Sequence, residues 1–502
     1  MQFFEGATYY HENSGYSFEK VKTLYREFAN EPAPPSVKEF PGRPKIPLTI
    51  SEALRTDNLE NSLTIASRFQ TFRKISDEPI EAQKLVDLLY LTNGVTLEKD
   101  LTNRKLFFRA APSASALYPT DIYLLVKNVN GLEPGLYYFN PEAKQLVSIN
   151  SSVDLGKFRN STFNLALLND APALLVLAGN LPRVAWKFES RAYRYCLQDA
   201  GYVLQNLLVG AASLGLACNY TGDFADDQLN ELLGLDGNDE FSLVLAAVGK
   251  DRGEASEEKY QFGMQRDEIP TGTHGNLNHF MHRISRHYLP SENLLNVEVK
   301  LPYHHRQEQT AAEPKNKLSL LNELLPLRTA THEIIRKRRS NHSFLRSVIS
   351  INELSQILRR LSLSPTLYGY NAQHIYLAAN DVDGLAPGLY RYHPPQHSLR
   401  DIRTGAFRGD LSYLTIAQDA VFNCSVALFF AVDFSDYAFF ANRGYRYAHI
   451  NTGMLGETAY LVATELGVGV RGIGNYFDSS LNTFFKLPEG REYILGGIIL
   501  GK

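Results

Sequence analysis

Residues 191–216 read RAYRYCLQDAGYVLQNLLVGAASLGL, and residues 443–468 repeat this segment in altered form as RGYRYAHINTGMLGETAYLVATELGV. The offset between the two is 443 − 191 = 252. A second pair, GLEPGLYYFNPEAKQLVSI at 131–149 and GLAPGLYRYHPPQHSLRDI at 384–402, has an offset of 384 − 131 = 253. Two copies of one unit within a chain predict an internal pseudo-dimer. Positions at which the copies differ should indicate which half retains each part of a shared site.

The composition predicts a soluble protein of two domains. A chain of 502 residues exceeds what one core normally serves, and 44% hydrophobic with 21% charged residues is typical of globular domains. The net charge of −3 predicts no general attraction to nucleic acid or to an anionic membrane. Cys196, Cys218 and Cys424 lack CxxC or metal-type spacing, which argues against a disulfide framework and a metal site. Without a signal-like apolar run or a membrane-spanning one, we expect a cytoplasmic protein.

We divide the chain into an N-terminal extension (1–50), a first domain (51–250), a linker (251–327) and a second domain (328–502). The extension is rich in proline, with PAPPS at 32–36, and is expected to be largely extended coil on the surface. The linker is polar and varied, with some helical parts.

Hydrophobic periodicity predicts an α+β fold for each unit. Leu85 and Leu89 fall on one face of an expected helix, and residues 192–216 form a long helix buried on more than one side. Segment 97–108 is polar and then apolar, and is interpreted as a loop. The second copy begins with a helix through THEIIRKRR and repeats the order. Strands are expected over 121–129, 135–139, 171–180 and 241–249.

Three short segments contain residues suited to binding or chemistry. RKRRSNHSF at 336–344 gathers guanidinium groups beside a serine, a combination that holds phosphate, although spacing alone favours a solvated basic helix end. PSASALYP at 112–119 would let the backbone approach a flat ligand, although an ordinary loop before a strand explains it as well. GVGVRGIGNY at 467–476 is rich in glycine and either admits a cofactor ring or turns the chain.

Lys187 precedes the long helix, where partial desolvation would lower the pKa of its amine enough for it to act as a base. A solvated lysine is the simpler interpretation of the spacing. Tyr193 and Tyr195 recur in the second copy as Tyr445 and Tyr447, which favours a packing role for them.

Four further segments of the chain are RAAPSASALYP (109–119), GLEPGLYYFNP (131–141), KFESRAYRYCLQDAGYVLQNLLVGAASLGL (187–216) and GDFADDQLNELLGLDG (222–237). Together they resemble the SagB-type, flavin-dependent members of the nitroreductase superfamily. The opening YYHENSGYSFEKV is also similar to that family's N-terminal stretch. The tandem form, with a resemblance over nearly the whole chain, is similar to the azoline oxidases of cyanobactin-type peptide biosynthesis.

The resemblance implies tandem nitroreductase-like domains with FMN at their interface. One unit supplies an RRS-type phosphate motif and a glycine turn, and the other supplies the PSxxxLxP loop. The cofactor-binding residues implied are Arg338, Arg339, Ser340, His342, Gly472, Ile473, Gly474 and Lys502 from the second copy, and Pro112, Ser113, Ala114, Ser115 and Tyr118 from the first.

The two copies divide these motifs between them. The RRS motif is intact only in the second copy, because the first reads ASRFQTF at 66–72. The loop is intact only in the first copy, because the second reads PTLYGYNA at 365–372, with Tyr368 in place of Ser115. We therefore expect one complete flavin site per chain and no flavin at the second, pseudo-symmetric site.

In the resembled oxidases a Lys-Tyr pair serves catalysis. Lys187 matches the lysine, but Phe188 stands at the tyrosine position and cannot donate a proton, so Tyr193 or Tyr195 would have to substitute. The second copy has Phe439 where Lys187 would fall, again consistent with one reactive site.

The leading hypothesis is FMN-dependent dehydrogenation of thiazoline or oxazoline rings in a peptide, with oxygen as the electron acceptor and Lys187 and Tyr193 as catalytic residues. One alternative is an NAD(P)H-dependent nitro or quinone reductase, and another is a flavin-free peptide-binding scaffold. The sequence leaves open whether two such chains form a homodimer.

Overall fold

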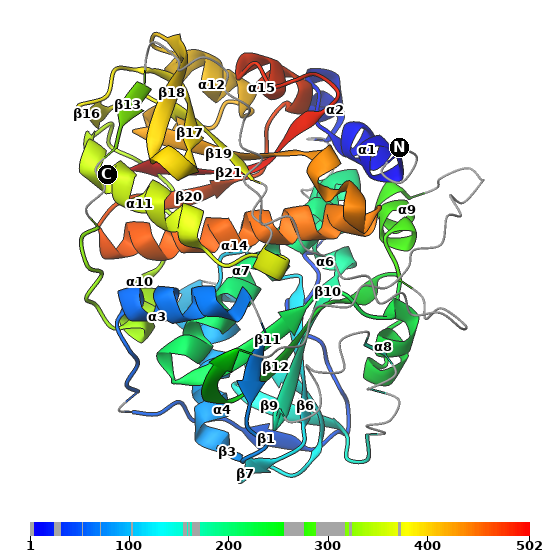
Figure 1. The fold of residues 1–502 in the computed structure, drawn as a ribbon. Coiled ribbons are helices and arrows are strands. Elements are labelled where there is room, and N and C mark those ends of the chain that lie inside the picture. Colours follow the sequence, from blue (N-terminus) through cyan, green and yellow to red (C-terminus); the bar gives the residue numbers. More distant parts are fainter. Residues whose placement is uncertain are drawn as a thin grey trace.

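Two antiparallel sheets with the same strand order, one in each half of the chain, form the framework of the molecule (Figure 1). The structure is a computed structural model that describes residues 5–24, 32–52, 54–70, 72–101, 104–153, 158, 161–162, 171–255, 276–287, 317–320, 324–369 and 373–502. The predicted α+β fold, a tandem pair of units forming an intramolecular pseudo-dimer, is confirmed. In the described part of the chain, no helix has the length and apolar character needed to cross a membrane.

The first sheet runs β1-β9-β8-β6-β10-β12-β11, and the second runs β13-β18-β17-β15-β19-β21-β20. The register agrees between the copies, because the shift after Leu177 in β10 recurs after Phe430 in β19. In the first sheet the strands are β1 (Lys45–Pro47), β6 (Thr120–Val126), β8 (Gly135–Asn140), β9 (Gln145–Asn150), β10 (Ala173–Asn180), β11 (Leu216–Thr221) and β12 (Glu240–Ala255), with β2 (Arg73–Ile75) paired to β12. In the second they are β13 (Lys317–Ser319), β15 (His374–Ala379), β17 (Gly388–His393), β18 (Ser398–Thr404), β19 (Val426–Asp433), β20 (Gly469–Ile473) and β21 (Glu492–Gly501).

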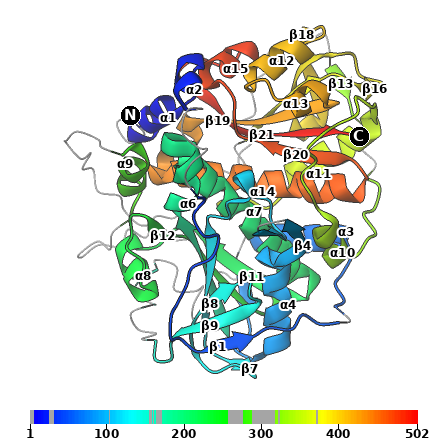
Figure 2. The ribbon, with the colours of Figure 1, turned by 180° about the vertical axis from the view of Figure 1, so that it is seen from behind.

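Helices cover the sheets and fill the space between them (Figures 1 and 2). The first unit contains α3 (Leu59–Ala66), α4 (Ala82–Asn93), α6 (Leu181–Phe188), α7 (Ala192–Ser213) and α8 (Asp226–Leu233). The second contains α10 (Thr331–Lys337), α11 (Ile351–Leu363), α12 (Arg408–Leu414), α13 (Asp419–Asn423), α14 (Arg443–Glu465) and α15 (Asp478–Phe484). The expected strands and long helix of the first copy are therefore confirmed, apart from shifts of a few residues at their ends.

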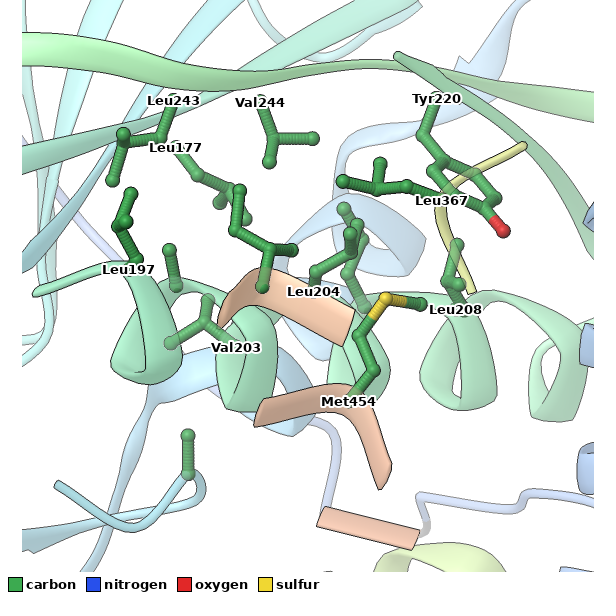
Figure 3. Packing of buried hydrophobic residues seen from close by; sticks show 14 of the residues in the cluster. Leu177, Leu197, Val203, Leu204, Leu208, Tyr220, Leu243, Val244, Leu367 and Met454 are labelled. Atoms are coloured by element: carbon green, nitrogen blue, oxygen red, sulfur yellow. The ribbon is translucent and has the colours of Figure 1, made fainter. Parts of the chain in front are cut away.

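The long helix α7 is buried along nearly its whole length, as its apolar spacing predicts. One face of α7 packs on the first sheet, and the second unit adds Met454 and Leu367 to the same cluster (Figure 3). The core is therefore shared by the two units, because apolar side chains from both halves pack around this helix. The other labelled members of the cluster are Leu177, Leu197, Val203, Leu204, Leu208, Tyr220, Leu243 and Val244.

The two central helices, α7 and α14, cross with their backbones in contact at Gly201 and Gly453, which are themselves 252 positions apart. A Cβ atom added at Gly201 would lie 2.9 Å from Cα of Gly453 and would collide with the carbonyl oxygen of Ile450. A Cβ atom at Gly453 would likewise lie 3.0 Å from Cα of Gly201 and collide with the carbonyl oxygen of Gln198. Glycine is thus required at both positions for this close approach.

Two reciprocal buried ion triads link the units on either side of the crossing. From the first unit, Arg191 and Arg194 each donate to Asp478 of the second, both at 2.6 Å. From the second unit, Arg443 and Arg446 bind Asp226 of the first, with Arg446 Nη1 at 2.7 Å from Asp226 Oδ1. Because each carboxylate meets two guanidinium groups, the pKa of Asp478 and that of Asp226 are held below the ordinary range against the opposing effect of burial.

The N-terminal extension departs from the predicted extended coil. It contains α1 (Glu5–Ser14) and α2 (Phe18–Leu24), and Ala7 and Tyr10 of α1 are fully buried. The prediction holds for residues 32–44, which contain most of the prolines and form no helix or strand, but it was wrong for residues 5–24, where α1 is held by tertiary contacts with both units. Segment 97–108 is likewise not a loop, because β4 (Val95–Leu101) and β5 (Arg104–Arg109) pair as an antiparallel hairpin.

Most of the predicted linker lies outside the described residues, but its described part holds α9 (Leu277–Ile284), which packs beside α1 (Figure 2). These two helices are a further repeat. The carbonyl of His11 and the hydroxyl of Ser14 accept hydrogen bonds from Arg194, and the carbonyl of His282 and the hydroxyl of Ser285 accept them from Arg446. The offset is 282 − 11 = 271. Each copy is therefore preceded by a related short helix.

We expect Gly201→Ala to destabilise the protein strongly, because the added methyl group overlaps backbone that cannot move without separating the two helices. The free energy of unfolding should fall by about 3 kcal/mol, which for units of this size lowers the melting temperature on the order of 5–10 °C. Gly409→Ala is the matched control, since nothing lies within 4 Å of its added Cβ. Equal melting temperatures for the two variants would contradict the close crossing.

Candidate active site

The basic motif of the second unit reaches across the interface between the units. Helix α10 ends at Lys337, so Arg338 continues in extended backbone, and its side chain donates from Nε to the carbonyl of Ala110 at 2.7 Å and from Nη2 to that of Arg109 at 3.0 Å. Two positions on, the Ser340 hydroxyl lies 2.8 Å from the hydroxyl of Tyr460. The motif therefore joins the backbone just before the 112–119 loop of the first unit.

The glycine segment of the second unit meets the same tyrosine. The backbone N–H of Gly472, at the end of β20, donates to the Tyr460 hydroxyl at 2.7 Å. Ser340 and Gly472 are thus brought together by Tyr460, a residue that the sequence analysis missed. Its counterpart in the first copy, at the offset of 252, is the apolar Leu208. A comparison of the two copies could therefore have identified Tyr460 as a polar residue present in only one of them.

Arg339 lies half-buried beside Arg338 and donates to Thr96 Oγ1 at 3.2 Å and to the carbonyl of Arg336 at 2.9 Å. Among the described residues, no carboxylate lies within ion-pair distance of Arg338 or Arg339. Burial, and then the neighbouring charge of Arg338, lower the pKa of Arg339. Two adjacent guanidinium groups without a paired carboxylate, next to a serine hydroxyl, form a favourable environment for an anion such as a phosphate.

The 112–119 loop is held by Asp199 of α7, which the sequence analysis did not single out. The Ser113 hydroxyl donates to Asp199 Oδ2 at 2.5 Å, and the backbone N–H of Ala114 donates to Oδ1 at 3.3 Å. Ser113 in turn accepts from the backbone N–H of Tyr118 at 2.8 Å. Burial raises the pKa of Asp199 to about 7. The loop places Ser115 at φ 54°, with its side chain exposed.

At the pseudo-symmetric position the corresponding space is filled by Tyr368. Its backbone, with φ 60°, has the conformation of Ser115, but its ring is buried. The ring stacks beside Phe440 with centroids 5.8 Å apart, contacts Tyr447 at 5.2 Å, and its hydroxyl accepts from the backbone N–H of Gly222 at 3.0 Å. An aromatic ring of the chain itself thus occupies this place.

The residues that contact the Tyr368 ring have counterparts in the first copy, where Ser115 is exposed and contributes no ring. Phe188 and Tyr195 correspond to Phe440 and Tyr447, and their ring centroids are 4.2 Å apart. Gly474 corresponds to Gly222, and an added Cβ there would lie 2.7 Å from the Tyr195 hydroxyl and collide with the ring. The residues present therefore fit a flat aromatic group over bare backbone, because the same set of contacts accommodates a tyrosine ring in the other copy.

The first-copy counterpart of the basic motif, 66–72, lacks the paired charges. It includes η2 (Ser67–Gln70), which packs against β11 and against η6 (Leu367–Gly369), the turn that carries Tyr368. Phe69 and Phe72 are buried there. Of this segment Thr71, and of the 365–372 segment the last three residues, lie outside the described part of the chain.

Lys187 lies in the last turn of α6 with its amine 5.8 Å from the ring centroid of Phe188. Lys187 is exposed, but desolvation by its neighbours lowers the pKa of its amine, and the described part of the chain places no carboxylate at ion-pair distance from it. Tyr193 is not brought to this place. It is fully buried, with its hydroxyl 3.3 Å from Ser285 Oγ and 3.4 Å from His282 Nδ1, whereas Tyr195 flanks Phe188.

The remaining predicted residues have separate surroundings. His342 is exposed, and its carbonyl accepts from Arg471 at 3.5 Å. The Lys502 amine lies 2.9 Å from Glu353 Oε1, so its charge is paired with that carboxylate. Pro112 and Ile473 are buried.

Both halves of the chain match the same protein family. The model of the family described as the nitroreductase family matches residues 65–250 and 335–502. The candidate nitroreductase MJ1384 of Methanocaldococcus jannaschii is 30% identical over 181 residues, which is 36% of this chain and 86% of that protein. A candidate nitroreductase of Anabaena variabilis ATCC 29413 shares the fold along the whole chain, with a TM-score of 0.77, 23% identity and 99% of each chain covered.

Asp199→Asn should change the pH dependence of stability. A folded-state pKa raised to about 7 means that Asp199 contributes stability at low pH, which is lost as the pH rises toward 7. Asn451, the counterpart of Asp199, accepts the backbone N–H of Leu367 at 2.7 Å, so an asparagine can hold this turn. The melting temperature of the variant minus that of the parent should therefore increase as the pH is raised from 5 to 8. A constant difference over that range would contradict the buried carboxyl.

Proposed function

The chain belongs to the nitroreductase family and is therefore an oxidoreductase, and from this we propose that it is an FMN-dependent oxidase of peptide azolines. It would dehydrogenate thiazoline or oxazoline rings of ribosomally made peptides to the aromatic azoles, as in cyanobactin-type biosynthesis. The observation that carries the proposal is the contrast between Ser115, which is exposed, and Tyr368, whose buried ring packs on Phe440 at the corresponding position of the other copy.

The residues on either side of the interface suit FMN. Arg338, Arg339 and Ser340 would hold the phosphate, and Gly474 and the loop at Ser115 would face the ring. This division agrees with the two copies, because the basic motif belongs to the second unit and the open loop to the first. FMN held by these residues would supply the acceptor for the substrate hydride, with dioxygen as the proposed final electron acceptor.

Lys187 would serve as the base. Aromatisation of an azoline removes a proton from the carbon next to the carbonyl and a hydride from the neighbouring ring carbon, and a neutral amine can accept that proton. Desolvation lowers the pKa of Lys187, which is the direction that this role requires. Phe439 at the corresponding position of the other copy cannot accept a proton, which again limits the chemistry to one site.

The substrate class rests on the resemblance of residues 109–119, 131–141, 187–216 and 222–237 to SagB-type enzymes, together with the tandem form of the chain. The test is to incubate the enzyme and FMN with a thiazoline-containing peptide and measure the loss of two hydrogens per ring by mass spectrometry. Rapid bleaching of the flavin by NAD(P)H, with no change in the peptide, would instead identify a reductase. A colourless protein that binds the peptide would identify a scaffold.

Replacing Lys187 should abolish most of the dehydrogenation. We expect Lys187→Ala to lower the rate about 100-fold or more, the usual contribution of a general base. The parent rate should rise with pH as the amine loses its proton, with a midpoint below the ordinary lysine pKa of about 10.4. Lys187→Arg keeps the positive charge but cannot act as a base, so full activity in that variant would rule out the assignment. Bound FMN should be unchanged in both variants.

Substitutions in opposite halves of the chain should deplete the same flavin. Arg339→Ala removes one of the proposed phosphate contacts, and Ser115→Tyr copies the ring that fills the other place. Each is expected to reduce the FMN that copurifies with the chain, measured by absorbance after denaturation. Arg336→Ala, which removes an exposed positive charge in the same segment, and Ser115→Ala are the controls. Depletion by only one of the two test variants would contradict a site assembled from both halves.

A further inference from the structure

The helices α1 and α9, which precede the two copies, contact them in equivalent ways but with one difference. In both, a histidine carbonyl and a serine hydroxyl accept from an arginine of the central helix. The backbone N–H of Tyr16, after α1, donates to Asp478 at 2.8 Å, and that of His287, after α9, donates to Asp226 at 2.9 Å. These shared contacts hold each helix against the central helices in the same way.

The difference is a set of polar contacts that only the first copy receives. Asn278 of α9 donates from Nδ2 to the carbonyl of Glu189 at 2.7 Å, and its Oδ1 accepts from the backbone N–H of Tyr193 at 3.1 Å. The Tyr10 hydroxyl of α1 lies 2.8 Å from the carbonyl of Ser190 and 2.9 Å from Asn278 Oδ1. Asn278 and Tyr10 are both buried, so these bonds are protected from water.

Neither contact exists in the second copy. At the offset of 271, Ala7 corresponds to Asn278 and Met281 corresponds to Tyr10, and neither side chain can donate a hydrogen bond of this kind. The turn there is met instead by the backbone N–H of Ala7, which donates to Asn442 Oδ1 at 3.1 Å. The side-chain contacts are therefore specific to the half of the molecule that contains Lys187.

The residues so held form the strained turn that ends α6. Glu189 has φ 44°, a left-handed value that is unfavourable for a side chain other than glycine. Ala441, its counterpart, has φ 48°. A strained turn persists only where its surroundings fix it, and Lys187 lies two residues before this one. The bonds to the carbonyls of Glu189 and Ser190 hold the backbone directly after the last turn of α6, the turn that carries Lys187.

We propose that Asn278, assisted by Tyr10, is a positioning residue for Lys187: it holds the turn at Glu189 and so keeps the lysine amine beside the Phe188 ring. Asn278 itself does not contact the reacting atoms. The segment before the second copy thereby serves the site of the first, which explains why α9 has Asn278 where α1 has Ala7. This inference rests on the proposed role of Lys187, but its test does not depend on that role.

The test is the reactivity of Lys187 toward an amine reagent, acetic anhydride, over a range of pH, in the full-length protein with FMN, resolved by peptide mass spectrometry. Desolvation lowers the pKa of Lys187, so releasing the turn should raise it toward the ordinary value. In Asn278→Ala we expect the midpoint of the Lys187 labelling profile to move to higher pH, so that its labelling rate at pH 8 falls. Asn278→Asp keeps the acceptor but loses the donor to Glu189 and should fall similarly.

Asn442→Ala is the matched control, because it removes the contact between α1 and the corresponding turn of the other copy and should leave Lys187 labelling unchanged. An unchanged labelling profile in folded Asn278→Ala would overturn the proposal. Should that variant fail to fold, Tyr10→Phe decides, because it removes one hydroxyl and should shift the profile in the same direction by a smaller amount. Full dehydrogenation by Lys187→Ala would refute the role of Lys187 as the base. The labelling experiment would still decide separately whether Asn278 positions Lys187.

Discussion

The contact between α7 and α14 at Gly201 and Gly453 sets the relation between the two units. Backbone meets backbone there, so the helices approach more closely than side chains would allow, and the interface that results is buried along both helices. The reciprocal triads of Asp478 and Asp226 then fix the units on either side of the crossing. Breaking one partner of such a buried ion group is costly, because an uncompensated charge remains. Residues from opposite halves can therefore build a single site.

The symmetry of this framework makes its asymmetry informative. Ser115 and Tyr368 share a backbone conformation, yet one is exposed and the other is a buried ring. Asp199 of the first copy corresponds to Asn451 of the second. Glu457, which is buried in α14 of the second copy, corresponds to Gln205 of the first. Burial raises the pKa of Glu457 to about 8. Burying a carboxyl group costs more free energy than burying an amide in the same place. A carboxyl group that is present in one copy and absent from the other therefore indicates the side of the interface on which we expect chemistry.

Sequence reasoning recovered the repeated framework because its signals are strong. The apolar spacing of residues 192–216 and the continuous apolar strand at 171–180 specify buried elements without reference to the rest of the chain. The hairpin at 95–109 was missed because it belongs to neither main sheet, and so has no alternating apolar face. The α1–α9 repeat was missed because little beyond one histidine and one serine is retained at a different offset.

The site was predictable in part for the same reason. Comparing the copies located the basic motif and the loop, since each is intact in only one half. It did not reveal that Arg338 binds the carbonyls of Arg109 and Ala110, because that contact joins segments 228 positions apart. Nor did it place Tyr193, whose surroundings are set by α9. Contacts of this kind depend on the relative position of elements, which local periodicity does not encode.

The central claim is that one chain, although it contains two copies of the fold, assembles a single flavin site. The most direct measurement is the number of FMN molecules bound per chain at saturation, determined from flavin absorbance and protein concentration on the same sample. The account predicts one. Two molecules per chain would show that Tyr368 does not close the second place, and none would show that the exposed loop at Ser115 serves another purpose.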